Sequence, residues 1–170
     1  LLVDELPNGE TYPLEAKAGS VPVRIVPCWR FNDWTNPLRI LLALWKCQPD
    51  VVLYNLQFAS FGDQKVPAAL GLVTPALSRL SGFITVTLMH NLMDTIDLKS
   101  AGFGGNIERV MRFFGTLLTR LVLTSNLVAL TIPKYVELLE QKYHARNVLL
   151  MPHGAFEDIP EPDYKLDQAK

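Results

Sequence analysis

The stretch "FITVTLMHN", residues 83–91, decides the fold class. Its first seven residues are apolar or β-branched with no charged residue among them, and the run then ends at His90 and Asn91. A short run of this kind is typical of a strand covered on both faces, as in a parallel sheet packed between helices. Similar runs occupy residues 22–28, 50–56, 127–132 and 147–151. Together with residues 83–89, they predict a sheet of five strands.

Segments with helical spacing separate these apolar runs. They cover residues 36–47, 66–82, 106–125 and 133–144. Pro37 and Pro133 lie near two predicted helix starts, where proline is favoured, and Pro75 predicts a kink in the second helix. The alternation predicts an α/β protein with a Rossmann-like parallel sheet and helices on both faces. We expect residues 1–158 to form this domain and residues 159–170 to be a linker or a frayed tail.

Composition excludes some classes of function. The chain has 170 residues, of which 49% are hydrophobic, and its formal net charge of -1 gives no general attraction to nucleic acid. Cys28 and Cys47 have no C-x-x-C spacing, which favours buried, reduced thiols over a metal site or a disulfide. No secretory leader is recognisable, and residues 117–132 are too interrupted to span a membrane. We therefore expect a cytoplasmic protein.

Polar residues gather where the predicted strands end, and this is where open α/β sheets bind their ligands. The residues at these ends that can bind a substrate are Asn55, Gln57, His90, Asn91, Asp94, His153 and Gly154. An imidazole titrates near neutral pH, so His90 can donate or accept a proton. The alternative is that His90 only caps a backbone carbonyl at the end of its strand. Gly154 permits a turn that a Cβ atom would block.

Two weaker patterns lie outside this set. The glycine-rich segment "GFGG" contains Gly102, Gly104 and Gly105 before a predicted helix, and its backbone N–H groups could hold an anion. An ordinary turn is the favoured interpretation, because glycine clusters between elements usually form turns. His144 is expected at a helix C-terminus. The sequence contains no G-x-S-x-G, Walker or G-x-G-x-x-G motif.

The predicted helix from residue 106 to about residue 124 combines arginines with phenylalanines and leucines. One interpretation is a basic amphipathic face that rests on anionic lipid or a lipid-linked substrate. The other, which the sequence favours, is a helix that packs its apolar stripe on the sheet and leaves its arginines in solvent.

Three segments become more informative when they are read in order. They are "PDVVLYNLQ" at residues 49–57, "ITVTLMHNLMD" at 84–94, and "LVALTIPKYVELLEQKYHARNVLLMPHGAFED" at 127–158. The second contains "TLMHN", which resembles a T-x-H-[DN] motif, and the third contains "LLMPHGAFE", which resembles v-I-P-N-G-V-D with His153 in place of asparagine. In this order the segments resemble the N-terminal domain of the large family of retaining nucleotide-sugar glycosyltransferases with the two-domain GT-B architecture.

The resemblance implies transfer of a sugar from a nucleotide diphosphate sugar to a glycan or lipid-linked acceptor. It gives His90 the catalytic position next to the sugar or acceptor, with Asn91 and Asp94 orienting it. His153 and Gly154 would shape the wall of the cleft. A C-terminal donor-binding domain of the same protein would face this domain. The resemblance implies no metal ion, and no cofactor besides the nucleotide sugar, which is a substrate.

The chain also departs from that family. Leu53 and Asn55 stand where the family often has histidines, and Pro133 stands where serine commonly begins a helix. The family's first strand and glycine-rich loop are not recognisable before residue 22, so we expect a part of a larger protein that is inactive in isolation. An open sheet edge at that place would predict a homo-oligomer. The alternative functions are a non-catalytic Rossmann-like binding or interaction domain and, less favoured, a flavodoxin-like regulator.

Overall fold

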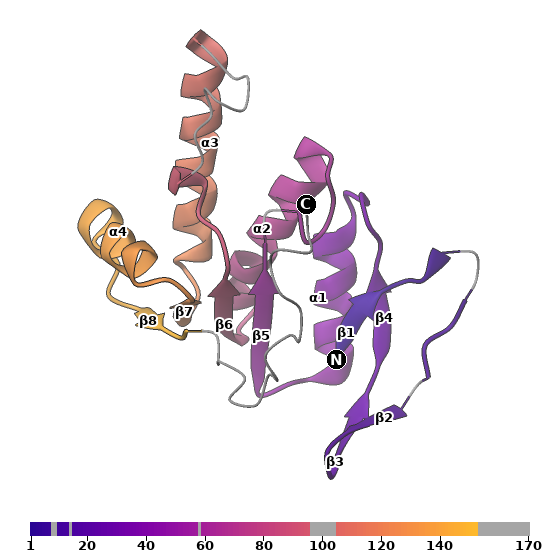
Figure 1. The fold of residues 1–170 in the computed structure, drawn as a ribbon. Coiled ribbons are helices and arrows are strands. Elements are labelled where there is room, and N and C mark those ends of the chain that lie inside the picture. The colour runs from indigo at the N-terminus through magenta and orange to yellow at the C-terminus, as the bar shows by residue number, and fades with distance from the viewer. Residues whose placement is uncertain (8–9, 14, 58, 96–104, 153–170) are drawn as a thin grey trace, which may run out of the picture.

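A four-stranded parallel sheet forms the centre of the molecule (Figure 1). The computed structural model describes residues 1–7, 10–13, 15–57, 59–95 and 105–152. The strands of this sheet, in their spatial order, are β5 (Val51–Leu56), β6 (Ile84–Met89), β7 (Leu127–Leu130) and β8 (Val148–Leu150). The predicted α/β class with a Rossmann-like parallel sheet is therefore confirmed.

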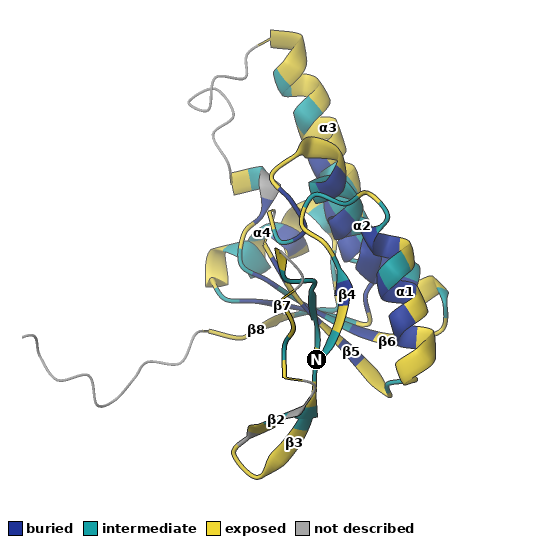
Figure 2. Cartoon of the chain, turned by 90° about the vertical axis from the view of Figure 1, so that its right-hand side faces the viewer, coloured by how far each residue is buried: buried dark blue, intermediate teal, exposed yellow. Residues whose placement is uncertain are grey.

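Four helices alternate with the strands in the described part of the chain. They are α1 (Asn36–Cys47), α2 (Lys65–Leu80), α3 (Gly105–Val122) and α4 (Pro133–Tyr143). Pro37 and Pro133 both lie in a first helical turn, where a missing N–H costs nothing, and α2 continues through Pro75. Helices α1 and α2 lie on one face of the sheet and α4 lies on the other (Figures 1 and 2). His144 ends α4, as predicted.

The strands of the sheet differ in how completely their two faces are covered. In β5, Val52 and Leu56 are buried, whereas Val51 and Leu53 are 50% and 64% exposed. In β7 the whole segment from residue 128 to residue 130 is buried, because α4 packs over β7 and β8. Coverage of both faces therefore holds at β7, but not at β5 within the described residues.

The prediction that residues 22–28 form one strand of the main sheet is wrong. The structure divides it into β3 (Val21–Arg24) and β4 (Val26–Trp29). β3 pairs antiparallel with β2 (Glu15–Ala18), and β4 pairs parallel with β1 (Leu2–Asp4). Pro22 and Pro27 have no N–H to donate, so this segment cannot form a complete ladder inside a larger sheet.

The core consists of two clusters of buried residues. The first joins β4, α1, β5 and α2, and its buried side chains include Ile40, Leu44, Leu56 and Phe61. The second joins β6, β7, α3 and α4 through Met89, Leu92, Val122, Val128, Leu130 and Leu139. The second cluster includes only one residue from α3.

The packing of α3 differs from the favoured prediction. Its buried residues are Gly115, Thr119 and Val122, and the helix packs mainly against α2 rather than against the sheet. The prediction that it packs its apolar stripe on the sheet is therefore wrong. Two of these three buried residues are small, and the larger apolar side chains Ile107, Val110, Phe113, Phe114 and Leu117 are exposed.

The two cysteines have different environments. Cys28 in β4 is 8% exposed, and burial raises the pKa of its thiol to about 11. Cys47 at the end of α1 is exposed, so the expectation of buried thiols is confirmed for Cys28 and wrong for Cys47. Neither forms a disulfide.

We expect this difference to separate the two thiols in a labelling experiment. With Ellman's reagent at mildly alkaline pH, Cys47 should react quickly, and Cys28 should react only after denaturation, because the thiolate is the reacting form. The Cys47→Ser variant should keep only the slow reaction. Equal labelling rates for both thiols in the native protein would contradict the buried position of Cys28.

A second prediction concerns two buried threonines of β6. The hydroxyl of Thr87 lies 2.9 Å from Ser125 Oγ, whereas Thr85 Oγ1 has no hydrogen-bond partner among the described residues. Since an unpaired buried hydroxyl gains nothing for its desolvation, Thr85→Val should leave the free energy of unfolding unchanged or raise it by about 1 kcal/mol. Thr87→Val should lower it by about 1 kcal/mol, because Ser125 loses its partner. Urea denaturation would test this, and equal destabilisation by both variants would refute it.

Candidate functional site

The carboxyl ends of β5 and β6 bring His90 and Asn55 together. The two strands pair in register from Val51 with Ile84 to Leu56 with Met89. The backbone N–H of His90 then donates to the carbonyl of Leu56 at 3.2 Å, which extends the ladder by one residue. At this position the His90 side chain lies over the end of β5, and its Nε2 is 2.5 Å from Asn55 Oδ1.

This contact orients the imidazole ring of His90. Asn55 Oδ1 can only accept a hydrogen bond, so in this contact the Nε2–H of His90 donates. The ring is half-buried and Asn55 is exposed. A histidine oriented in this way is a group type that takes part in proton transfer to or from a reacting hydroxyl.

Asp94 lies in a different cluster. It belongs to the short 3-10 helix η2 (Met93–Thr95), and its Oδ2 accepts a hydrogen bond from the Tyr143 hydroxyl at 2.6 Å. Its Oδ1 accepts one from Lys142 Nζ. This carboxylate raises the pKa of Lys142, and burial together with the same carboxylate raises the pKa of Tyr143. The structure therefore places Asp94 as a clamp between the segment after β6 and the end of α4, and gives the His90 ring Asn55 as a partner.

Three of the other predicted residues are described, and four lie outside the described ranges. Asn91 and Gln57 are both exposed, and the backbone N–H of Gln57 donates to Ser60 Oγ at 2.7 Å. Gly105 begins α3 with a φ of 62°, in the left-handed region that favours glycine. The remaining predicted positions, Gly102, Gly104, His153 and Gly154, lie outside the described residues.

Asn32 joins two loops of the molecule, and it was not predicted from the sequence. Asn32 adopts a φ of 63°, and its Oδ1 accepts hydrogen bonds from the backbone N–H groups of Asp63 at 3.0 Å and Gln64 at 3.1 Å. Its Nδ2 donates to Asp63 Oδ1 at 2.8 Å. A Cβ atom at Gly62 would lie 2.3 Å from Asn32 Oδ1, so only glycine fits there. These bonds join the loop after β4 to the loop after β5.

A pocket of about 540 Å³ lies along β5. Its walls come from β1, β4, α1 and β5, and Asn55 and Ser60 line it near the carboxyl end of β5. Most of the other lining side chains are apolar, among them Leu2, Val26, Trp29 and Leu44. β5 is the terminal strand of the main sheet in the described part of the chain, and the pocket lies beside that edge. His90 is not among the lining residues, so the pocket borders the polar pair without containing it.

The described part of the chain contains neither a group of metal-binding side chains nor a membrane-spanning helix. Among the described residues, no three His, Cys, Asp or Glu side chains lie close enough together to hold a metal ion. None of the helices in the described ranges is both long and apolar enough to cross a bilayer.

Comparison with known proteins assigns no family. No family model, no curated protein and no solved structure matches the chain. The fold is therefore known from the structure alone.

Proposed function

We propose that the chain is the N-terminal, acceptor-side domain of a retaining glycosyltransferase. This enzyme would transfer a sugar from a nucleotide diphosphate sugar to a glycan or lipid-linked acceptor. The observation that carries the proposal is the 2.5 Å contact between His90 and Asn55 at the carboxyl ends of β5 and β6. The histidine of the "TLMHN" segment thus lies where open α/β sheets bind their ligands. The order of the three glycosyltransferase-like segments gives further support.

In this proposal the polar pair acts on the acceptor side of the reaction. Asn55 holds the ring of His90, and His90 contacts the transferred sugar or the acceptor hydroxyl. Asn91 and Gln57 are exposed next to them and can bind further hydroxyl groups. Asp94 positions the segment after β6 through its bonds to α4.

The donor phosphates need other groups. Departure of a nucleotide diphosphate requires fixed hydrogen-bond donors or cations where negative charge develops. We assign that role to a C-terminal donor-binding domain of the same protein, and we place the reaction in the cytoplasm. The proposed mechanism uses no metal ion and no further cofactor.

A second candidate function is a non-catalytic binding or interaction domain. The specific observation in its favour is the largely apolar pocket along β5, which borders Asn55 but does not include His90. A domain of this kind would bind an apolar ligand or segment there and would not transfer sugars.

The two candidates differ in one assay. The protein that carries this chain would be incubated with a panel of UDP- and GDP-sugars, with glycan and lipid-linked acceptors, and nucleotide release would be measured. The proposed function predicts release that depends on one donor and one acceptor class. If the protein neither turns over nor binds any nucleotide sugar, the glycosyltransferase proposal fails and the binding domain becomes the better account.

A further inference from the structure

Helix α3 presents an apolar stripe to solvent. At 3.6 residues per turn, Ile107, Val110, Phe114 and Leu117 follow one another along one face, and Phe113 borders it. All five side chains are exposed, and Phe113 and Phe114 are 66% and 52% exposed. The two phenylalanine rings pack edge to face with their centroids 5.7 Å apart. Five large apolar side chains on one exposed helix face form a contiguous patch that water solvates poorly.

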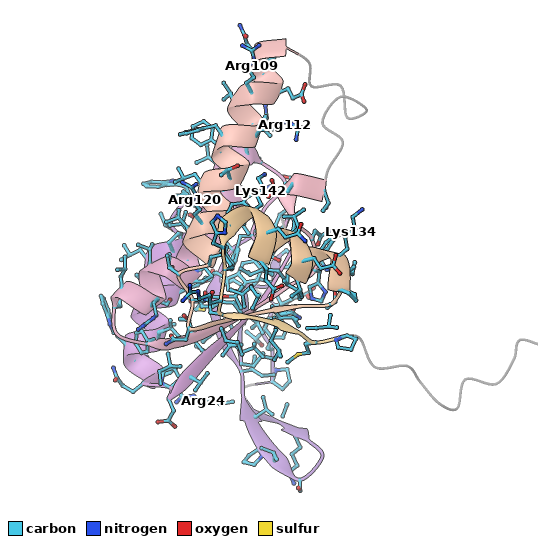
Figure 3. All side chains as sticks on the ribbon, turned by 90° about the vertical axis from the view of Figure 1, so that its left-hand side faces the viewer. Arg24, Arg109, Arg112, Arg120, Lys134 and Lys142 are labelled. Carbon is cyan, nitrogen blue, oxygen red and sulfur yellow. The ribbon has the colours of Figure 1, made fainter. Side chains whose placement is uncertain are left out.

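Arginines border this stripe. On the same helical wheel, Arg109 and Arg120 follow the stripe on the side of Phe113, and both are exposed. Arg112 forms an ion pair with Glu108 at 2.9 Å. The helix contains three arginines and one glutamate, so its basic side chains outnumber its acidic ones. Figure 3 shows Arg109, Arg112 and Arg120 along the length of α3, and it labels Lys134 and Lys142 on α4.

The helix also extends beyond the rest of the molecule. Its buried residues lie in its C-terminal half, and its N-terminal half projects past the other elements (Figures 1 and 2). The projecting half lies on the side of the carboxyl ends of the strands, because α3 contacts η2, which directly follows β6 and His90.

We propose that α3 docks this protein on an anionic lipid bilayer, with its apolar stripe in the interface and its arginines on the lipid phosphates. The features required are an apolar face, a basic border and a helix that can lie in the plane of the membrane. Phosphate groups complement Arg109 and Arg120, which would remain near water while the phenylalanines enter the acyl region. This surface does not depend on the proposed sugar transfer. If both hold, docking brings His90 toward the bilayer, where a lipid-linked acceptor lies.

A second copy of the chain fits the stripe less well. Two antiparallel copies of α3 that cover each other's stripes would bring Arg109 of one copy close to Arg120 of the other. Juxtaposed like charges in an interface cost several kcal/mol. An anionic surface has no such penalty, so charge complementarity favours the bilayer.

Vesicle flotation tests the proposal without any enzymatic activity. The protein would be mixed with vesicles of phosphatidylcholine alone or of an equimolar mixture with phosphatidylglycerol. We expect flotation with the anionic vesicles and a fall of at least about tenfold in the bound fraction for Phe113→Ser/Phe114→Ser. Arg109→Gln/Arg120→Gln should weaken binding to anionic vesicles, as should added salt. Leu80→Ser is the matched control, since Leu80 is an exposed apolar residue on α2, away from the stripe.

Circular dichroism should show the same fold for all variants, because every substituted side chain is exposed. Failure of the wild type to float with anionic vesicles would overturn the proposal, and so would flotation that the double phenylalanine variant leaves unchanged. A dimer in solution that the same variant dissociates would show that α3 is a protein interface and would equally overturn it. None of these outcomes depends on whether the protein transfers sugars.

Discussion

Replacing His90 by alanine is expected to lower the rate of sugar transfer by about 10²–10⁴-fold in the protein that carries this chain, the range typical of a positioned acid–base group. The physical reason is the location of the ring. His90 lies at the carboxyl end of β6, half-buried and held by Asn55. In the proposed function its loss removes an oriented group from the side of the acceptor hydroxyl. Initial rates with the preferred donor and acceptor would measure the effect.

Two matched variants separate this role from a structural one. Asn55→Leu should reduce transfer less than His90→Ala, because the imidazole remains but loses the partner that fixes its orientation. His144→Asn should leave transfer unchanged, since this histidine caps α4 with a φ of 55°, which asparagine also tolerates. Near wild-type transfer by a folded His90→Ala variant would exclude His90 from the reaction.

The largest expected loss of stability comes from Asn36→Ala. Asn36 begins α1 and is only 1% exposed. Its Oδ1 accepts from the backbone N–H of Arg30 at 2.9 Å, and its Nδ2 donates to the carbonyl of Arg30 at 2.7 Å. Removal of the amide leaves both backbone groups without these bonds, so the free energy of unfolding should fall by roughly 2–4 kcal/mol. Urea denaturation followed by circular dichroism would measure the change.

Controls for this prediction come from two other changes. Asn36→Asp keeps the acceptor but loses the donor and buries a charge, so it should also be strongly destabilising. Asn91→Ala removes an exposed amide and should change stability by less than about 0.5 kcal/mol. If Asn36→Ala were as mild as Asn91→Ala, the two bonds to Arg30 would not hold the turn between β4 and α1.

Sequence predicted the elements that local chemistry determines. The helix at residues 36–47 was predicted with the observed bounds, because a proline in the first turn and amphipathic spacing define it locally. The strand at residues 22–28 failed because two prolines remove backbone donors, and its pairing partners lie in the short strands β1 and β2, which have no strong apolar pattern. Strand pairing depends on distant residues, which local periodicity does not specify.

In the candidate site, too, the sequence predicts what local rules determine and misses contacts that depend on the packing of distant elements. The rule that ligands bind beyond the carboxyl ends of strands selected both His90 and Asn55, although they are 35 positions apart. It could not reveal that Asp94 binds Tyr143, since that contact depends on how α4 packs beside η2. Likewise, an amphipathic pattern is the same for a helix that covers a sheet and for one that exposes its stripe. Only the packing of α3 on α2 distinguishes the two.

The most direct test of the site is a measurement on the imidazole nitrogens of His90. Nitrogen-15 NMR of the protein, assigned with the His90→Ala and His144→Asn variants, would be recorded before and after addition of nucleotide sugar and acceptor. We predict that Nε2 of His90 carries the hydrogen of the contact with Asn55 in the free protein, and that the ring signals of His90 shift when substrates bind while those of His144 stay unchanged. If the His90 signals do not change at saturating substrate, or if its hydrogen is on Nδ1, the account of His90 and Asn55 as the acceptor site is contradicted.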